Sequence, residues 1–413
     1  MRIVEPRITV VGAPWRELVF LELSTDDGLT GVSEVRMVNK TDTLVACLHE
    51  LAGRYLIGSD PFDLERLAWN VQRAEYGRPG EVTQSALAAF DIACWDLMGQ
   101  ALGVPVWKLL GGCFRKRVPA YANGWYQAER EPSAIARLAR DVVGRGYRAL
   151  KLDPFGAASA ELPAADRRRA EAIIRSVREA VGPDVEILVE MHGRFTPATA
   201  VRVAAMLESY DPEWIEEPVP PENAAALARV RAATRIPIAT GERAHTVADI
   251  REFIERGLAD VVQVDLTHFG GFLAMKRLAG WADAHYLLMA PHNVCGPVGT
   301  MANVHFAVAT TNYKVLEHFN DFADSWVHEL VDRSPRVAAE DGCFELPDRP
   351  GLGLRLNHEV CRAHPRTGGR IKLFEEGWER RGTSKPQVSS LKSQDSKQKS
   401  QDGILSVDLD RER

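Results

Sequence analysis

The sequence predicts an α/β protein: a modified (β/α)8 barrel of the TIM type, in (β/α)7β order, with an α+β capping domain in front of it. The first observation is a change of rhythm near residue 115, from strand pairs and helices to a strict alternation of strand and helix. The second is the number of strand patterns, eight in about two hundred residues with about seven helical stretches between them. An open doubly wound sheet usually has fewer strands, so the barrel is favoured.

Residues 1–115 carry the pattern of the capping domain. The segments RITVVG and ELVFLELSTDDGLTGVSEV are typical of antiparallel strands, with a turn at DDG. Helical patterns follow, and the clearest is VTQSALAAFDIACWDLMGQALG. Strands followed by helices indicate an α+β domain.

Residues 116–329 carry the barrel pattern. Helical stretches such as AADRRRAEAIIRSVREAVG and TPATAVRVAAMLESY show the apolar spacing of amphipathic helices. The predicted strands between such helices are VPAYAN, YRALKLD, VEILVEMH, EWIEEPV, IPIATGE, DVVQVDL, YLLMAPH and YKVLEHF. Helices that alternate with strands in this way cross over between parallel neighbours.

Two further segments complete the predicted domain organisation. Residues 330–375 lose the barrel rhythm, and RPGLGLRLN suggests that the chain returns there to complete the capping domain. Residues 376–413 form a Ser-, Lys- and Gln-rich run with too little apolar surface to offset the entropy of ordering. We expect this run to be a disordered polar tail.

Composition excludes several classes of function. The formal net charge of −6 argues against a nucleic-acid partner. No segment approaches the ~20 consecutive apolar residues of a membrane helix, and no signal peptide is visible at the N-terminus. Six widely spaced cysteines without a CxxC motif are typical of a reduced, cytoplasmic protein. The expected partner is therefore a small molecule.

Three glutamates stand at the ends of successive predicted strands. Glu190, Glu216 and Glu242 are separated by 26 and 26 residues, which is one strand–helix repeat each time. In a barrel the strand ends face one shared site, so the three carboxylates should converge. Alone, each Glu is more simply a solvated strand end, but three converging carboxylates repel one another unless they share a cation. Oxygen ligands with open positions favour Mg²⁺.

A His–Asp pair follows the same spacing. His292 ends the seventh predicted strand, and Asp265 lies 27 residues earlier at the end of the sixth. A carboxylate that fixes the tautomer of an imidazole produces a general base, although a lone histidine on an apolar strand is more often a core residue. His192 shares a strand end with Glu190, and strand alternation predicts that both side chains point into the same cavity.

Two strand ends carry weaker signals. Lys151 and Asp153 end the second predicted strand, where such a pair is often only an ion pair of small energy. Alternatively, Lys151 stabilises negative charge that develops near the metal. Glu317 ends the eighth strand and completes the inventory of polar strand ends.

The residues above resemble the enolase superfamily, in the branch that is similar to mandelate racemase. The resemblance covers Met1 to about Leu373, through TDDGLTGVSEV, ALAAFDIACWDLMGQALGVPVWKLLGG, the glutamate triplet and the Asp–His pair. Within that branch, RVPAYANGWYQ, ALKLDPFG, EMHGRF and PGLGLRLN look most similar to gluconate- and galactonate-type acid-sugar dehydratases. Many relatives have Asp at the position of Glu190, and racemases of the branch have Lys at the position of Asp153. The second departure disfavours racemisation.

The resemblance implies a carbon–oxygen lyase, specifically a hydro-lyase with one Mg²⁺ per subunit. It implies that His292, oriented by Asp265, removes the C2 proton of an aldonic acid and that His192 protonates the departing C3 hydroxyl. D-gluconate is the favoured substrate and D-galactonate the next, with a 2-keto-3-deoxy acid as product. The implied substrate-binding residues are Lys151, Asp153, Arg194, Glu317 (as a neutral hydrogen-bond donor) and Trp15 of the capping domain.

Three questions stay open at the level of sequence. A racemase or epimerase of a 2-hydroxy acid uses the same scaffold, and a catalytically silent binding protein is the alternative from a different class. A homo-oligomer is expected only because symmetric assemblies are common.

Overall fold

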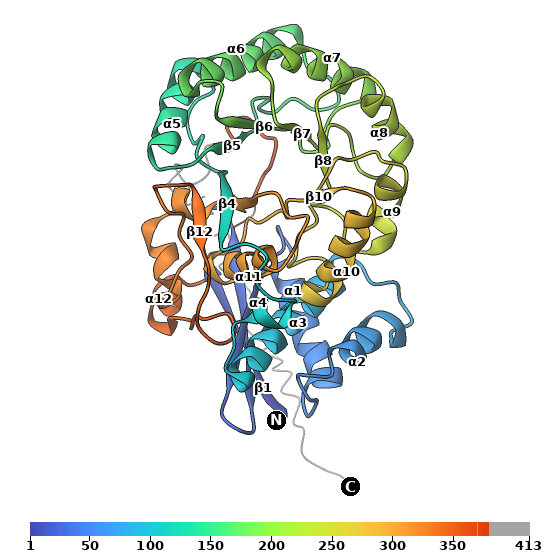
Figure 1. Cartoon of the computed structure of the whole chain (residues 1–413), viewed down its shortest axis with the longest axis vertical. Helices are drawn as coiled ribbons and strands as arrows, with labels where there is room; N and C mark the ends of the chain where they lie inside the picture. Colours follow the sequence, from blue (N-terminus) through green and yellow to red (C-terminus); the bar gives the residue numbers. More distant parts are fainter. Residues whose placement is uncertain (370, 380–413) are drawn as a thin grey trace, which may run out of the picture.

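The structure is a computed structural model that describes residues 1–369 and 371–379, with an antiparallel domain beside a ring of strands and helices (Figure 1). The predicted tail, residues 376–413, lies outside the described residues from position 380 onward. The first sheet has the order β1 (Ile3–Gly12), β2 (Glu17–Thr25) and β3 (Thr30–Val35). The β2–β3 turn contains Gly28, whose φ of 86° is readily adopted only by glycine.

Helices complete the first domain beside this sheet. They are α1 (Thr41–Leu51), α2 (Leu64–Trp69), α3 (Glu81–Leu102) and α4 (Val106–Leu109), with π-helical turns η1 (Ala52–Leu56) and η2 (Asn70–Ala74). Helix α3 is buried on most of its surface because it packs against β3 on one side and against helix α10 (Gly271–Ala284) of the barrel on the other. The Asp91 carboxylate of α3 accepts a hydrogen bond of 2.6 Å from the backbone N–H of Phe272 in α10.

Eight parallel strands form the second part, as predicted. They are β4 (Arg117–Ala122), β5 (Ala149–Leu152), β6 (Glu186–Glu190), β7 (Trp214–Glu216), β8 (Ile238–Thr240), β9 (Val261–Val262), β10 (Leu288–Met289) and β11 (Leu316–His318). Their spatial order is β10-β9-β8-β7-β6-β5-β4-β11, and a parallel bridge between Met289 and Tyr313, just before β11, joins the two ends. The sheet therefore curls into a barrel.

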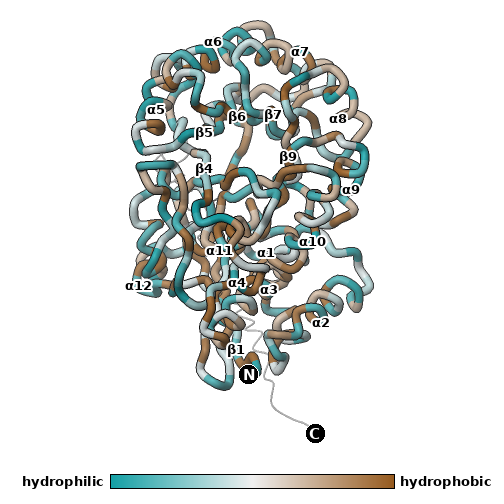
Figure 2. The backbone as a smooth tube through the Cα atoms, viewed as in Figure 1, coloured by the Kyte–Doolittle hydropathy of each residue, from teal (hydrophilic) through white to brown (hydrophobic). Residues whose placement is uncertain are grey.

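Seven crossover helices surround the strands and confirm the (β/α)7β order. They are α5 (Pro132–Gly144), α6 (Ala164–Val181), α7 (Pro197–Leu207), α8 (Ala224–Arg231), α9 (Val247–Glu255), α10 (Gly271–Ala284) and α11 (Pro297–Val308), with a 3₁₀ turn η3 (Glu208–Tyr210) after α7. Helix α6 illustrates the cause, since Ala170, Ile173, Ile174 and Val177 form one buried stripe. Figure 2 shows hydrophilic and hydrophobic segments alternating along these outer helices.

Inward-facing side chains fill the barrel below its mouth. They are Tyr121, Ala149, Leu188, Trp214, Ala239, Val261, Ala290 and Val315. Tyr121 and Trp214 meet edge to face, with ring centroids 5.8 Å apart. Strand alternation places the next inward residue two positions later, at Lys151, Glu190, Glu216 and Glu317. The apolar layer is thus the floor of the polar site.

The chain beyond β11 contacts both parts. It forms η4 (Asn320–Phe322), η5 (Ser325–Leu330), β12 (Cys343–Glu345) and α12 (His358–Ala363), and β12 pairs antiparallel with β4. Bridges from Gly351 to Pro105 and from Pro365 to Val11 then join this segment to the first domain. Among the described helices, none has the length and apolar character needed to cross a membrane.

Candidate active site

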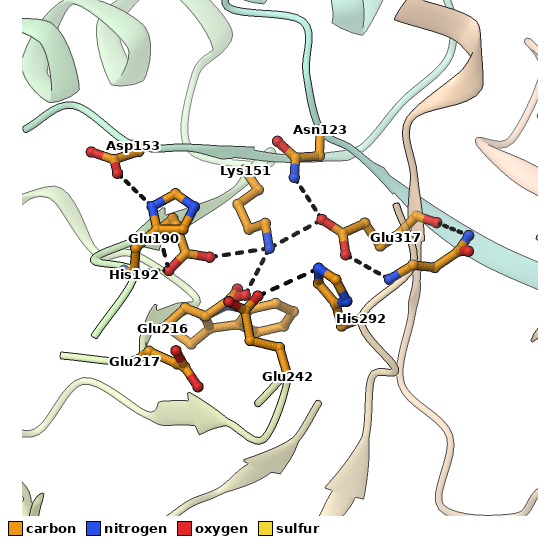
Figure 3. A network of polar contacts seen from close by, with 12 residues as sticks. Asn123, Lys151, Asp153, Glu190, His192, Glu216, Glu217, Glu242, His292 and Glu317 are labelled. Carbon is orange, nitrogen blue, oxygen red and sulfur yellow. Dashed lines mark hydrogen bonds and ion pairs between the residues drawn. The ribbon is translucent and has the colours of Figure 1, made fainter. Parts of the chain in front are cut away.

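The three predicted glutamates converge at the barrel mouth (Figure 3). Glu190 and Glu216 are direct partners across β6 and β7, and one carboxylate oxygen from each of Glu190, Glu216 and Glu242 lies within 4.8 Å of the others. Burial and the charge of Glu216 raise the pKa of Glu190 well above its usual range. A divalent cation would relieve this repulsion, so an all-oxygen donor set of this kind fits Mg²⁺.

The positive charge of Lys151 partly neutralises the negative charge of the carboxylates. Its Nζ lies 2.7 Å from Glu216, 3.1 Å from Glu317 and 3.3 Å from Glu190. Burial alone would lower the pKa of Lys151, but the charges of Glu216 and Glu317 outweigh it and raise that pKa well above its usual value. Lys151 is therefore a fixed positive charge at the centre of the site.

The Asp265–His292 pair forms on one side of the carboxylates. His292 Nδ1 is 2.8 Å from Asp265 Oδ2, while the backbone N–H and the hydroxyl of Thr267 both donate to Asp265 Oδ1 at 2.7 Å. The other ring nitrogen, Nε2, lies 3.5 Å from Glu242. Burial would lower the pKa of His292, but Glu242 and Asp265 raise it to about 9. A cation bound by Glu242 would weaken this effect.

His192 lies on the opposite side, held by Asp153. Its Nδ1 is 2.6 Å from Asp153 Oδ2, and its backbone N–H donates to Glu190 Oε1 at 2.6 Å. Burial lowers the pKa of His192, against the attraction of Asp153. We expected strand alternation to point His192 into the cavity, but this explanation is wrong. Strand β6 ends at Glu190, and His192 has a left-handed φ of 49°. The turn that follows β6, and not the alternation of side chains along the strand, brings the imidazole of His192 to the cavity.

Glu317 takes a different role from the one implied by the resemblance. It accepts hydrogen bonds from Asn123 Nδ2 at 2.6 Å and from the backbone N–H of Asn293 at 2.8 Å. Burial would raise its pKa, but Lys151 and His292 lower it. We therefore correct the expected neutral hydrogen-bond donor to an ionised acceptor.

Glu217 and Arg243 belong to the site but were missed from the sequence. Glu217 is buried with a left-handed φ of 40°, and burial together with the charge of Glu242 raises its pKa to about 8. Arg243 Nε lies 3.1 Å from Glu217, and the same guanidinium donates to the backbone carbonyl of His192. The sequence could have indicated both residues, because Glu217 and Arg243 are ionisable residues that directly follow the predicted ligands Glu216 and Glu242.

A cavity of ≈ 430 Å³ opens above these groups. This volume is within the usual range for a small-molecule site. Its walls include Lys151, Glu190, Glu242, His192 and His292 from the barrel, Trp15 and Arg36 from the first domain, and Ile371 and Leu373 from the end of the described chain. Asp153 and Arg194 lie behind His192, where Arg194 Nη2 donates to Asp153 Oδ2 at 2.6 Å. Their contacts favour a role in orienting His192.

Known sequence families match both parts of the chain. Residues 6–111 match the mandelate racemase/muconate lactonizing enzyme N-terminal domain, and residues 134–360 match the enolase C-terminal domain-like family. A D-gluconate dehydratase of Thermoproteus tenax is 34% identical over 368 residues, which cover 88% of this chain and 73% of the relative. A D-gluconate/D-galactonate dehydratase of Picrophilus torridus is 31% identical over 91% of this chain and 93% of the relative.

Solved structures share the whole fold. The crystal structure of a mandelate racemase/muconate lactonizing enzyme from Jannaschia sp. CCS1 is similar with a TM-score of 0.84 and 33% identity, covering 90% of this chain and 100% of that chain. This similarity confirms the predicted combination of barrel and capping domain.

Proposed function

The chain belongs to the enolase superfamily, in its mandelate racemase/muconate lactonizing enzyme branch, and from this premise we propose that it is a Mg²⁺-dependent acid-sugar dehydratase. The reaction is the elimination of water from C2 and C3 of an aldonic acid. One observation carries the proposal: two histidines, each hydrogen-bonded to its own aspartate, line one cavity on opposite sides of the carboxylate cluster. Figure 3 shows the two imidazoles, the three carboxylates and Asp153. Removal of water needs two proton transfers, one at C2 and one at the C3 oxygen.

His292 is the proposed base for the first transfer. The hydrogen-bonded Asp265 carboxylate keeps the proton of the neutral ring on Nδ1, so that Nε2, the nitrogen nearer Glu242, is free to accept the C2 proton. Glu190, Glu216 and Glu242 would hold Mg²⁺, which would supply electrophilic stabilisation of the charge that develops on the substrate carboxylate. The ammonium of Lys151 adds a second positive charge at the same place.

His192 is the proposed acid for the second transfer. It delivers a proton to the C3 hydroxyl, the C3–O bond breaks, and water leaves with the electron pair of that bond. The electrons of the former C2–H bond form the C2–C3 double bond. The resulting enol takes a proton at C3 as it tautomerises to the 2-keto-3-deoxy acid. Asp153 holds His192 for this step through Nδ1, at 2.6 Å.

D-gluconate is the proposed first substrate and D-galactonate the second, because relatives of similar identity carry these names. We propose one Mg²⁺ per subunit and a homo-oligomeric assembly. The six cysteines are all unpaired, which supports the proposed cytoplasmic location.

The competing functions have weaker support. A racemase of this branch would place a base at position 153, where the Asp153 carboxylate is instead engaged by both His192 and Arg194. A silent binding protein would have no need for a complete set of carboxylates and two oriented histidines.

A substrate panel tests the proposal. We would incubate the purified protein with Mg²⁺ and a set of sugar mono- and diacids, and assay each reaction for 2-keto-3-deoxy product. The proposal expects turnover of one or two aldonic acids, lost on addition of EDTA. C2–H exchange with deuterated water in the absence of product would favour an epimerase, and no reaction in either assay would favour the silent protein.

A further inference from the structure

The described chain ends in a strap, residues 371–379, that joins the capping domain to the barrel mouth. At its start, the side chain of Asn39 forms two hydrogen bonds with the backbone of Ile371, one donated at 2.9 Å and one accepted at 2.8 Å. Ile371 and Leu373 then line the active-site cavity. The strap thus forms part of the wall of the site, although no motif in the sequence marks it.

Two aromatic residues of the strap contact His192. The ring of Phe374 lies 5.4 Å from the imidazole centroid and the ring of Trp378 also lies 5.4 Å away, each near a perpendicular arrangement. The two aromatic rings touch each other at 5.5 Å. His192 is 15% exposed at its side chain, and the two rings of the strap form part of its enclosure.

The same two residues also support the groups that hold His192. Trp378 Nε1 donates to the Gly156 carbonyl at 3.0 Å, and Arg194 Nη1 donates to that same oxygen at 2.7 Å. The guanidinium of Arg194 lies 4.4 Å from the ring centroid of Phe374. Because Arg194 pairs with Asp153, which in turn holds His192 Nδ1, the strap contacts both the imidazole and its support.

A single hydrogen bond at Nδ1 does not fix the orientation of an imidazole, because the ring can still tilt about that contact. Neighbouring rings remove this freedom, and small displacements of a reacting group are costly in rate. We propose that Phe374 and Trp378 are positioning residues that hold His192 where it can protonate the departing hydroxyl. This inference rests on the proposed dehydratase function, and it concerns only the second proton transfer.

Partitioning of the intermediate tests the proposal. Once His292 has removed the C2 proton in deuterated water, the intermediate either loses its C3 hydroxyl or returns to substrate that carries deuterium at C2. We expect Trp378→Ala to raise the ratio of exchange to elimination by about tenfold or more, because only the acid is displaced. Trp378→Phe keeps a ring beside His192 and should restore most of the wild-type ratio. A general structural defect would slow both outcomes and leave the ratio unchanged.

A second variant and a control variant distinguish loss of positioning from a general folding defect. Asn39→Gly removes the side-chain tether of the strap, and glycine accepts the left-handed φ of 59° at this position without strain. It should shift the ratio in the same direction by a smaller factor. Trp69→Ala is the matched control, because Trp69 is 64% exposed on the first domain, and it should leave the ratio at the wild-type value.

Amide hydrogen exchange gives a readout that does not depend on activity. Trp378→Ala should accelerate exchange several-fold in the peptide from Met191 to Phe195, while Trp69→Ala should not. An unchanged ratio and unchanged amide exchange in Trp378→Ala would overturn the positioning role. If the wild-type protein gives neither product nor C2 exchange, the dehydratase function fails, and amide exchange alone then decides whether the strap holds His192.

Discussion

Asp265→Asn is the sharpest test of how the base is prepared. Asp265 Oδ1 accepts two hydrogen bonds from Thr267, and Oδ2 faces His292 Nδ1. In the variant, the amide oxygen must occupy the Oδ1 position, because an NH₂ group there would face two donors of Thr267. The NH₂ group then faces His292 and donates to Nδ1, which places the ring proton on Nε2. The nitrogen that should accept the C2 proton is therefore blocked.

The expected loss is large. Forcing an oriented histidine base into the wrong tautomer costs about 10⁴-fold in turnover, or roughly 5 kcal/mol of transition-state stabilisation. The substrate-binding and carboxylate groups are unchanged, so KM should change much less than kcat. Raising the pH should not restore the rate, because the defect lies in the tautomer and not in the charge of His292.

The assay is C2–H exchange in deuterated water together with formation of the 2-keto-3-deoxy acid. Asp260→Asn is the matched control, since Asp260 is half-buried and pairs with Arg231 away from the cavity, and it should keep wild-type turnover. Exchange by Asp265→Asn within tenfold of wild type, or recovery at high pH, would show that Asp265 does not set the tautomer of His292.

Three other predictions follow from the same contacts. Glu190→Gln should lower Mg²⁺ affinity yet raise the Tm of the EDTA-treated protein, because a neutral side chain avoids the cost of burying a charge and the repulsion from Glu216. The rise should be about 1 °C per kcal/mol relieved, and a lower Tm in calorimetry would contradict this. His192→Asn should stop elimination and leave C2–H exchange intact, which NMR of recovered substrate would report; loss of both would refute the acid assignment. His305 accepts from the Trp107 N–H at Nδ1, and burial lowers its pKa to about 4, so it is neutral in the fold. Because this pKa is lower in the folded than in the unfolded state, stability is full above pH 6.5 and should fall by up to about 3 kcal/mol as pH drops toward 4. His268 has a pKa lowered by burial to about 4 as well, so urea midpoints should show this slope in wild type and His305→Gln should reduce it without abolishing it.

The part of the site that follows from periodicity was predictable from sequence. Glu190, Glu216 and Glu242 recur once per strand–helix unit, and parallel strands in a barrel bring equivalent positions to one end. Asp265 and His292 are also about one such unit apart, by 27 residues. Glu190 and Glu216 are the last residues of β6 and β7, whereas Glu242, Asp265 and His292 lie two or three positions beyond β8, β9 and β10. The repeat therefore predicted all five positions, although regular strands hold only the first two.

The remaining features depend on irregular backbone and on distant contacts. His192 and Glu217 adopt left-handed conformations that their residue types seldom show, so no local pattern announces them. The ionised state of Glu317 depends on Lys151, which is far away in sequence. Trp378 donates a hydrogen bond to the Gly156 carbonyl, although the two residues are 222 positions apart in the sequence. A single sequence contains nothing that predicts a contact between residues so far apart.

The most direct test of the central claim is the reaction of wild type and His292→Asn with D-gluconate and D-galactonate, in Mg²⁺ and deuterated water, followed by NMR. We expect wild type to form a 2-keto-3-deoxy acid carrying deuterium at C3, and His292→Asn to form neither this product nor C2-deuterated substrate. Product formation or C2 exchange by His292→Asn at the wild-type rate would show that His292 is not the base.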